Sequence, residues 1–458
     1  MKIAIIGNGI AGITAARWIR KLSDSADITV ISEEGDYFFS RTALMYIYMG
    51  HMRLRDTQPY ENWFWEKNRI DLLRGRVETV DFNAKSLKIK EQADFKYDKL
   101  IIATGSKSNK FGWAGQDLDG VHGLYHLQDV AAMERHSATG IKRAVVVGGG
   151  LIGIEMAEMF HSRHIPVTFL VRENNFWDNI LPIEESKMVN RQIAENGIDL
   201  RLKTELDSVL DDNKDGKADA IQIKNGEKLP CQFVGLTVGV SPNIDFLKNT
   251  PLPTASGSAI SIEKGIKVNN YLETNQPDVY AIGDCAELET PQAGRRPIEA
   301  IWYTGKMMGE TVAYNIVGKK VKYDPGIWFN SAKFFDIEYQ VYGDIRATKP
   351  DEHETIYWEH ADGKHAIRIN FDKNTEGVVG FNLMGVRYRH EVCEKWIRES
   401  TKVETVLQNL GLANFDPEFY KEYEEQVIAV YNKQFNKSLQ LKTKRGLNAV
   451  TRFLKAAF

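Results

Sequence analysis

Short apolar runs followed by glycine-rich turns mark two places in the chain. Residues 2–6 (KIAII) and 143–147 (RAVVV) are mostly apolar, which is typical of central strands of a parallel sheet that are buried on both faces. Each run leads into a glycine-rich turn and then into a segment of helical composition, residues 13–22 and 154–162. The repeated order of strand, turn and helix predicts an α/β fold built on parallel sheets.

The first glycine-rich turn, residues 7–12 (GNGIAG), has the G-x-G-x-x-G spacing of a phosphate-binding loop. Gly7 allows the tight turn, Gly9 lets the backbone approach a pyrophosphate, and Gly12 lets the helix pack closely on the strand. The helix N-terminus offers N–H groups and the positive end of its dipole to the phosphates. Glu33 follows the next apolar run, about 20 residues after the last glycine, where it can accept hydrogen bonds from ribose hydroxyls. These features predict a dinucleotide site.

The second glycine-rich turn, residues 148–153 (GGGLIG), repeats this arrangement with Gly148, Gly150 and Gly153. Two such units indicate that two dinucleotides are bound at once, because each unit recognises one pyrophosphate. The natural pair is a flavin and a nicotinamide nucleotide.

The strand after the second turn ends in Val171, Arg172 and Glu173. An acid at this place favours a free ribose 2′-hydroxyl, whereas an arginine accommodates a 2′-phosphate. Arg172 therefore favours NADPH over NADH. The alternative is that Arg172 points to solvent and that Glu173, or no side chain, contacts the ribose.

Two further strand ends complete the flavin interpretation. Residues 97–103 lead into Thr104 and Gly105, and residues 279–282 lead through a glycine into Asp284. An aspartate at the carboxyl end of a strand can accept hydrogen bonds from a polyol such as ribitol.

Together these motifs resemble the two-dinucleotide FAD/NAD(P)H oxidoreductases of the pyridine nucleotide–disulfide reductase superfamily. The matching segments are GNGIAG (7–12) with Glu33, YDKLIIATGS (97–106), VVVGGGLIGIEMAE (145–158), LTVGVSPN (236–243) and VYAIGDCA (279–286). The resemblance implies an α/β fold with two Rossmann-like dinucleotide-binding domains, glutathione-reductase-like, plus a C-terminal α+β interface domain with a helical tail. The implied parts are an FAD-binding domain (1–112 and 246–325), an NAD(P)H-binding domain (113–245), an interface domain (326–415) and the tail (416–458).

The resemblance also implies roles for individual residues. Those expected at FAD are Gly7, Gly9, Gly12, Glu33, Arg41, Thr104, Gly105, Asp284 and Trp302. Those expected at NAD(P)H are Gly148, Gly150, Gly153, Arg172 and Gly239. Trp302 lies at the start of the helix whose N-terminus faces the flavin pyrimidine in this family, where a positive dipole end stabilises the reduced ring.

Cysteines are missing where the thiol enzymes of this superfamily carry them. Residues 35–46 contain none, and Thr42 holds the place of a single redox cysteine. Cys231, Cys285 and Cys393 lie in no redox motif and read as packed residues. Residues 32–41 instead resemble rubredoxin and ferredoxin reductases, nitrite reductase flavin domains and apoptosis-inducing factor. Electrons are therefore expected to leave for an external acceptor.

Two candidate catalytic residues follow from this branch of the superfamily. Glu155 matches an acid near nicotinamide and flavin, whereas the lysine usual five residues after Arg41 is replaced by Tyr46. A Glu–Lys pair beside the flavin therefore cannot form, and Glu155 is left to hydrogen-bond Tyr46 or the nicotinamide amide.

Residues 416–458 are expected to form a helical tail. Asp416 and Pro417 are typical of an N-cap and the first helical position, and the helix would run to about Asn436. Residues 442–458 place apolar side chains on one face and basic ones on the other. Such a segment can pack on its own chain, contact an anionic membrane surface or dock a redox partner.

Net charge, histidine spacing and the length of the apolar runs reduce the number of function classes open to the chain. A formal net charge of −3 over 458 residues argues against nucleic-acid binding, and the spacing of the ten histidines indicates no metal site. No signal peptide or membrane-spanning run is apparent, which favours the cytoplasm. The predicted function is a non-thiol, FAD-dependent NAD(P)H oxidoreductase that passes electrons to a small carrier of the rubredoxin or ferredoxin type. The alternatives are a peripheral membrane quinone reductase and a flavin-bound sensor or structural protein.

Overall fold

A computed structural model describes residues 1–249, 259–416 and 421–442 of the chain. It divides into two compact units. The first contains residues 1–174 and 197–325, and the second contains residues 175–196 and those from 326 onward. The boundaries expected from the sequence for the FAD-binding domain, the NAD(P)H-binding domain, the interface domain and the tail stay a prediction.

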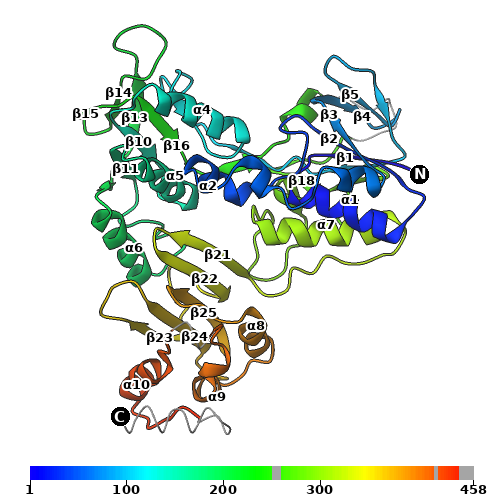
Figure 1. Cartoon of the computed structure of the whole chain (residues 1–458). Helices are drawn as coiled ribbons and strands as arrows, with labels where there is room; N and C mark the ends of the chain where they lie inside the picture. The colour runs from blue at the N-terminus through cyan, green and yellow to red at the C-terminus, as the bar shows by residue number, and fades with distance from the viewer. Residues whose placement is uncertain (250–258, 417–420, 443–458) are drawn as a thin grey trace. The chain divides into compact units, whose positions relative to one another are not determined.

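The first unit holds two five-stranded parallel sheets (Figure 1). One has the order β19 (Val279–Ala281), β7 (Lys99–Ile102), β1 (Lys2–Ile6), β2 (Asp27–Ser32) and β3 (Ile70–Arg74). Its centre is β1, which pairs on both sides, with Ile5 opposite Val30 and Ile101, and Ile5 is fully buried. The sequence's apolar first run is thus a central strand, as predicted.

The helices α1 (Ile10–Leu22) and α7 (Trp302–Ile316) lie side by side in this part of the first unit (Figure 1). Gly309 permits their close approach, since a Cβ there would lie 2.5 Å from the carbonyl oxygen of Ala11. Helix α7, from the second stretch of the first unit (197–325), therefore packs directly on α1, the helix that follows the first glycine-rich turn.

The second parallel sheet has the order β12 (Asp199–Leu202), β11 (Val167–Val171), β10 (Ala144–Val147), β16 (Phe233–Leu236) and β9 (Val121–His122). Two helices pack against this sheet: α5 (Leu151–Ser162), which follows the second glycine-rich turn, and α4 (Leu127–Ala138). A separate three-stranded antiparallel sheet, β13 (Leu206–Leu210), β14 (Ala220–Ile223) and β15 (Lys228–Pro230), shares a hydrophobic core with the parallel sheet.

Smaller elements complete the first unit. They are α2 (Leu44–Tyr48), α3 (Trp63–Lys67), the antiparallel sheet β4 (Val77–Asp81), β5 (Ser86–Ile89) and β6 (Phe95–Lys96), and the pairs β8 (Ser106–Ser108) with β17 (Val240–Pro242) and β18 (Ile266–Val268) with β20 (Ala286–Leu288).

The second unit is an α+β arrangement. Its antiparallel sheet has the order β21 (Phe329–Phe334), β22 (Ile337–Gly343), β25 (Val378–Met384), β24 (Ala366–Asp372) and β23 (His353–Glu359). Its helices are α6 (Ile183–Glu195), α8 (His390–Arg398), α9 (Val403–Gln408) and α10 (Glu424–Phe435). The α/β fold class with two parallel-sheet parts and a C-terminal α+β part is confirmed.

One helix boundary was predicted wrongly. The tail helix was expected to open at Asp416, but Asp416 and residues 421–423 are not helical and α10 begins at Glu424. Tyr423 explains the later start, because its buried ring packs 4.8 Å from the ring of Trp358 and its backbone forms the N-cap. The expectations for residues 417–420 and for the amphipathic segment beyond Lys442 lie outside the described residues.

Within the described residues, none of the helices has the length and the apolar character that crossing a membrane requires.

Candidate functional site

The first glycine-rich turn connects β1 to α1 and is sterically fixed at two of its glycines. Gly7 has φ +111°, and a Cβ there would lie 2.2 Å from the carbonyl oxygen of Ala103. A Cβ at Gly12 would lie 2.1 Å from the Gly7 carbonyl oxygen. At Gly9, the N-cap of α1, an added Cβ would meet no atom within 4 Å. The turn therefore packs tightly on the sheet and leaves open space at the one glycine predicted to face a pyrophosphate.

The second turn, between β10 and α5, repeats this division of roles. Gly148 has φ +117°, and its Cβ would lie 2.5 Å from the Thr237 carbonyl oxygen. The Cβ of a residue replacing Gly153 would lie 2.2 Å from the Gly148 carbonyl oxygen, whereas Gly150, the N-cap of α5, again faces open space. Neither Gly9 nor Gly150 has a side chain that could cap its helix. The first-turn N–H groups thus remain available to phosphate oxygens, and both turns fit a dinucleotide.

The positions predicted to contact ribose, at the two strand ends, differ in chemistry. Glu33 follows β2, and within the described part of the chain its exposed carboxylate has one long contact, 3.7 Å from Arg76 Nε. At the end of β11, Val171 is fully buried and its side chain has no hydrogen-bond acceptor. Arg172 is 73% exposed and donates to Glu173 Oε1 at 2.7 Å. The second site therefore presents a cation beside an acid, not a lone acid.

The carboxyl ends of β7 and β19 bring the predicted flavin-binding residues together. Asp284 Oδ2 accepts hydrogen bonds from Ser106 Oγ at 3.0 Å and from Tyr125 Oη at 3.1 Å. Burial raises the pKa of this carboxyl. Gly105 has φ +67°, and Thr104 Oγ1 is buried with no hydrogen-bond partner among the described residues. A buried hydroxyl without a partner fits a place where a polar ligand group arrives.

Arg41, expected near FAD, is held by an acid that sequence reasoning missed. Its guanidinium binds Glu34 through both nitrogens, at 2.9 and 2.5 Å, and also donates to the Tyr125 carbonyl oxygen. Leu127 N donates to the same carboxylate at 2.9 Å. Burial alone would raise the pKa of Glu34, but hydrogen bonds from His126 and Arg41 hold it at about 2. The available signal was a second acid next to Glu33, and the role of Arg41 at FAD stays a prediction.

The two candidate catalytic residues lie on α5 and α2, which pack against each other. Burial and the neighbouring Glu158 raise the pKa of Glu155 to about 7. The ring of Tyr46 stacks on His51, with centroids 6.2 Å apart. In the part of the chain that the structure describes, no hydrogen bond joins Glu155 to Tyr46. The alternative that Glu155 hydrogen-bonds Tyr46 is therefore not seen, and both catalytic roles stay predictions.

The contact between α2 and α5 is carried by Tyr48 instead. Its ring lies edge-on to Phe160, with centroids 5.7 Å apart, and under the Arg163 guanidinium at 3.7 Å. Arg163 Nε also donates to the Tyr48 carbonyl oxygen at 3.0 Å, and the same side chain pairs with Glu134. These contacts fix the helix that carries Tyr46.

The start of α7 is stabilised from the loop before it. Arg295 and Glu299 form a buried pair with contacts of 2.6 Å, and Thr304 Oγ1 donates to the Glu299 carbonyl oxygen at 3.1 Å. Trp302 begins the helix, with its ring centroid 5.4 Å from that of Tyr303. The N-terminal N–H groups of α7 have no side-chain cap, so they remain available to a ligand.

Gly239, the last predicted nicotinamide-site residue, lies between β16 and β17. It has φ +91°, and its carbonyl oxygen accepts a hydrogen bond from Asn109 N at 3.1 Å. This bond joins the chain after β16 to the chain after β8. Its contact with NAD(P)H stays a prediction.

The three cysteines are all buried thiols. Burial raises the pKa of Cys231 to about 12 and raises the pKa values of Cys285 and Cys393 as well. A reactive cysteine needs thiolate character and access. None of these thiols has either, which agrees with a site that uses no thiol.

Glu155 is expected to make stability depend on pH near neutrality. Its folded pKa of about 7 lies above the ordinary value of 4.5, so between these values the folded chain keeps a proton that the unfolded chain has lost. Stability should therefore fall as pH rises from 5 to 8, by about 2–3 kcal/mol. Denaturation of wild type and of Glu155→Gln across this range measures the difference. Parallel curves for the two proteins would show that Glu155 does not titrate there.

Comparison with known proteins identifies a matching family and several related proteins. Residues 1–309 match the family model described as pyridine nucleotide-disulphide oxidoreductase. The chain is 26% identical to the ferredoxin–NAD(+) reductase component of the p-cumate 2,3-dioxygenase system from Pseudomonas putida, over 88% of this chain and 94% of that protein. It is 30% identical to a rubredoxin–NAD(+) reductase from Acinetobacter baylyi, over 62% of this chain and 72% of that protein.

A solved structure shows the same fold. The NAD-dependent persulfide reductase from A. fulgidus superposes with a TM-score of 0.80 and 24% identity, covering 95% of this chain and 83% of that one. At this identity the similarity concerns the fold alone.

Proposed function

The chain belongs to the pyridine nucleotide-disulphide oxidoreductase family, and from this premise we propose that it passes electrons from NAD(P)H through FAD to a small carrier protein of the ferredoxin or rubredoxin type. Family membership makes it an NAD(P)H oxidoreductase and confirms the resemblance found in the sequence. The named relatives support the carrier, since one is a ferredoxin and one a rubredoxin reductase. The single observation that carries the proposal is the pair of glycine-rich turns with open space at Gly9 and Gly150.

The residues around the first turn would hold FAD. Gly9 lets the pyrophosphate reach the N-terminus of α1, Glu33 accepts hydrogen bonds from the adenosine ribose, and Asp284 accepts one from the ribitol chain. Ser106 and Tyr125 orient Asp284 through their bonds to its Oδ2. When bound, FAD supplies an acceptor for the hydride of NAD(P)H and a route for single electrons to leave.

The chain's own contribution to the reaction is positional and electrostatic. The uncapped N-terminus of α7 directs N–H groups and a positive dipole end toward a ligand, which favours negative charge there. Glu155, with a pKa of about 7, can hold a proton or release it near neutrality. No thiol takes part, because the three cysteines are buried and protonated. The electrons are therefore left for an external acceptor.

An acceptor comparison tests this proposal. Purified protein with bound FAD is mixed with NADH or NADPH and with ferredoxin, rubredoxin, a soluble quinone or oxygen, and nucleotide oxidation is followed. We expect turnover to depend on a carrier protein and to fall with rising ionic strength, as charge-steered protein encounters do. Turnover with quinone or oxygen that exceeds turnover with both carriers would contradict the proposal.

The nicotinamide nucleotide is proposed to be NADPH. The side chain of Val171 accepts no hydrogen bond from a 2′-hydroxyl, and Arg172 is exposed where a 2′-phosphate would lie. Arg172→Ala should lower kcat/KM for NADPH about tenfold and leave that for NADH within about twofold, because one charge-assisted contact is lost. Arg201→Ala on the adjacent strand β12 is a matched control. If the ratio of kcat/KM for NADPH to kcat/KM for NADH is unchanged in Arg172→Ala, Arg172 does not contact the 2′-phosphate. Glu173, or no side chain, would then contact the ribose.

A further inference from the structure

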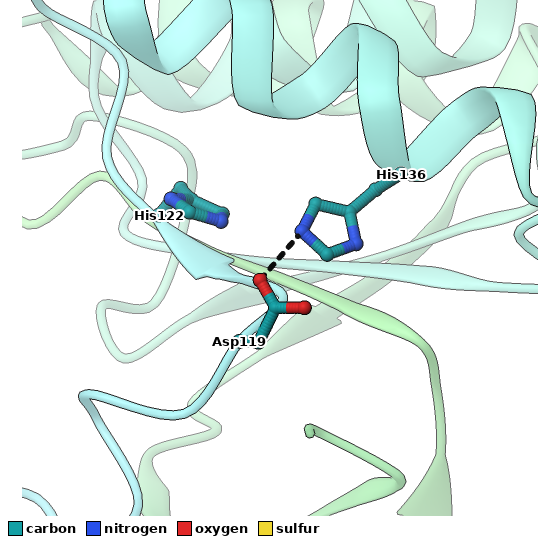
Figure 2. Close-up of side chains that lie close together, drawn as sticks. All are labelled: Asp119, His122 and His136. Carbon is teal, nitrogen blue, oxygen red and sulfur yellow. Dashed lines mark hydrogen bonds and ion pairs between the residues drawn. The ribbon is translucent and has the colours of Figure 1, made fainter. Parts of the chain in front are cut away.

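A cluster of one aspartate and two histidines lies at β9, the edge strand of the second parallel sheet, and Figure 2 shows the three side chains close together. Asp119 precedes β9, His122 ends it, and His136 lies on α4. One ligand atom of each lies within 4.8 Å of the other two, and His136 Nε2 lies 3.1 Å from Asp119 Oδ1. We propose that these three side chains bind a divalent transition-metal ion of the Zn²⁺ class.

The backbone holds Asp119 and His122 in place from both sides. Asp119 N donates to the Gly216 carbonyl oxygen at 3.0 Å, and the Asp119 carbonyl oxygen accepts from Ala218 N at 2.9 Å. Between the two ligands, Gly120 has φ +92°, and a Cβ there would lie 2.9 Å from the Gln232 carbonyl oxygen. The turn that brings the aspartate to the histidine is therefore set by the backbone and not by the side chains alone.

An aromatic ring orients both imidazoles. The ring of Phe233, on the neighbouring strand β16, stacks on His122 with centroids 5.7 Å apart and meets His136 edge-on at 5.8 Å. The two imidazole centroids are 5.4 Å apart. Two of the three ligands, His122 and His136, thus lie on a strand and a helix with their rings packed against a third element, which makes them more rigid than ligands on a loop.

A nitrogen without a partner in the described part of the chain and an exposed carboxylate in the cluster suit a metal ion. His122 Nε2 is buried and has no hydrogen-bond partner among the described residues, as expected where an ion or an ordered water completes the structure. Asp119 is 48% exposed, so water can fill the remaining coordination positions.

The donor set indicates the class of ion. Two imidazole nitrogens and one carboxylate suit Zn²⁺ and its first-row neighbours, whereas Ca²⁺ and Mg²⁺ prefer oxygen ligands. Arg135 Nη2 lies 3.9 Å from the same Asp119 oxygen, and this exposed side chain can turn into solvent when the ion binds. This site could not be predicted from the spacing of its residues, because Asp119, His122 and His136 match no recognised metal-binding pattern and meet only through the packing of α4 on β9.

A second cluster of the same composition offers a matched control. His360, Asp362 and His365 lie in the hairpin between β23 and β24, in the second unit. Both histidine Nδ1 atoms approach one oxygen, Asp362 Oδ2, at 3.0 and 2.8 Å. These contacts satisfy the histidines within a single exposed turn, so we expect no tight ion there.

The test is zinc binding by the full-length protein with FAD bound, after treatment with a chelator. Titration calorimetry with Zn²⁺ and measurement of protein-bound zinc should give one tight site. His136→Gln and Asp119→Asn should each weaken binding by about 100-fold or more, because each removes a ligand. His136→Cys should retain zinc, since a thiolate is also a zinc ligand. His365→Gln should bind as wild type does.

Flavin content and circular dichroism show whether each variant is folded, and exposed Asp119 gives the variant least disturbing to packing. Absence of a tight site in the wild type would overturn the proposal. So would a site that survives Asp119→Asn and His136→Gln, or one that is lost in His365→Gln. The result does not depend on NAD(P)H oxidation, so its failure is distinguishable from failure of the proposed function.

Discussion

Gly9→Ala should weaken FAD binding by about 10–100-fold while the chain still folds. Gly9 has φ −71° and ψ −178°, which alanine adopts without strain, and the added Cβ would meet no protein atom within 4 Å. It would instead occupy the space through which a pyrophosphate reaches the N-terminus of α1. Loss of a charge-assisted hydrogen bond from a backbone N–H costs about 1.5–3 kcal/mol. Equilibrium titration of the FAD-free protein with FAD measures the change.

Gly150→Ala is the matched variant at the second turn. It should raise the KM for NAD(P)H by a similar factor and leave FAD affinity as in wild type, because Gly150 faces open space in the other parallel-sheet part. Gly12→Ala should differ from both, since its Cβ would lie 2.1 Å from the Gly7 carbonyl oxygen and would destabilise the fold itself. Equal loss of FAD in Gly9→Ala and Gly150→Ala would refute the assignment of one dinucleotide to each turn.

Arg368→Met is expected to destabilise the second unit by about 3–5 kcal/mol. Arg368, on β24, binds Glu185 on α6 through two contacts of 2.7 and 2.8 Å, and it also reaches Glu184 at 2.7 Å. The side chains of Arg368 and Glu185 are only 6% and 1% exposed. Removal of the guanidinium leaves the Glu185 carboxylate buried, and among the described residues Asn382 then remains as its donor, at 3.0 Å. A buried charge without its counter-ion is costly.

Hydrogen exchange of the α6 amides measures this effect locally. In Arg368→Met we expect the free energy of opening α6 to fall, and in the double variant with Glu185→Leu we expect much of it to return, because no charge is then left unpaired. Arg191→Met removes the more exposed ion pair that the same helix makes with Glu359, and should cost no more than about 1 kcal/mol. Equal effects of the Arg368 and Arg191 variants would show that burial of the first pair does not matter.

The glycine-rich turns could be predicted from sequence because their physics is local. Gly7 and Gly12 are needed because a Cβ at either position would collide with a backbone carbonyl oxygen. The spacing between them is set by one turn and the start of one helix. The apolar runs around them predicted central parallel strands for the same reason, since only strands buried on both faces lack polar alternation.

Contacts between distant segments could not be predicted in this way. Glu34 meets Arg41 and Leu127 only once the chain around residue 125 has packed against the first turn, and nothing in the spacing shows that meeting. The cluster of Asp119 and His136 likewise depends on how α4 packs against β9. The local capping signal at Asp416 did not predict the helix start either. The helix begins after Tyr423, whose ring is buried against Trp358.

The central claim is that NAD(P)H reduces a flavin held by this chain without a thiol. Its most direct test is anaerobic mixing of the FAD-loaded protein with NADPH or NADH, in wild type and in a variant with all three cysteines replaced by alanine or serine. We predict that the oxidised flavin spectrum bleaches at a similar rate in both proteins, with one NAD(P)H consumed per FAD. A flavin that stays oxidised in the wild type, or bleaching that is lost with the cysteines, would contradict the account.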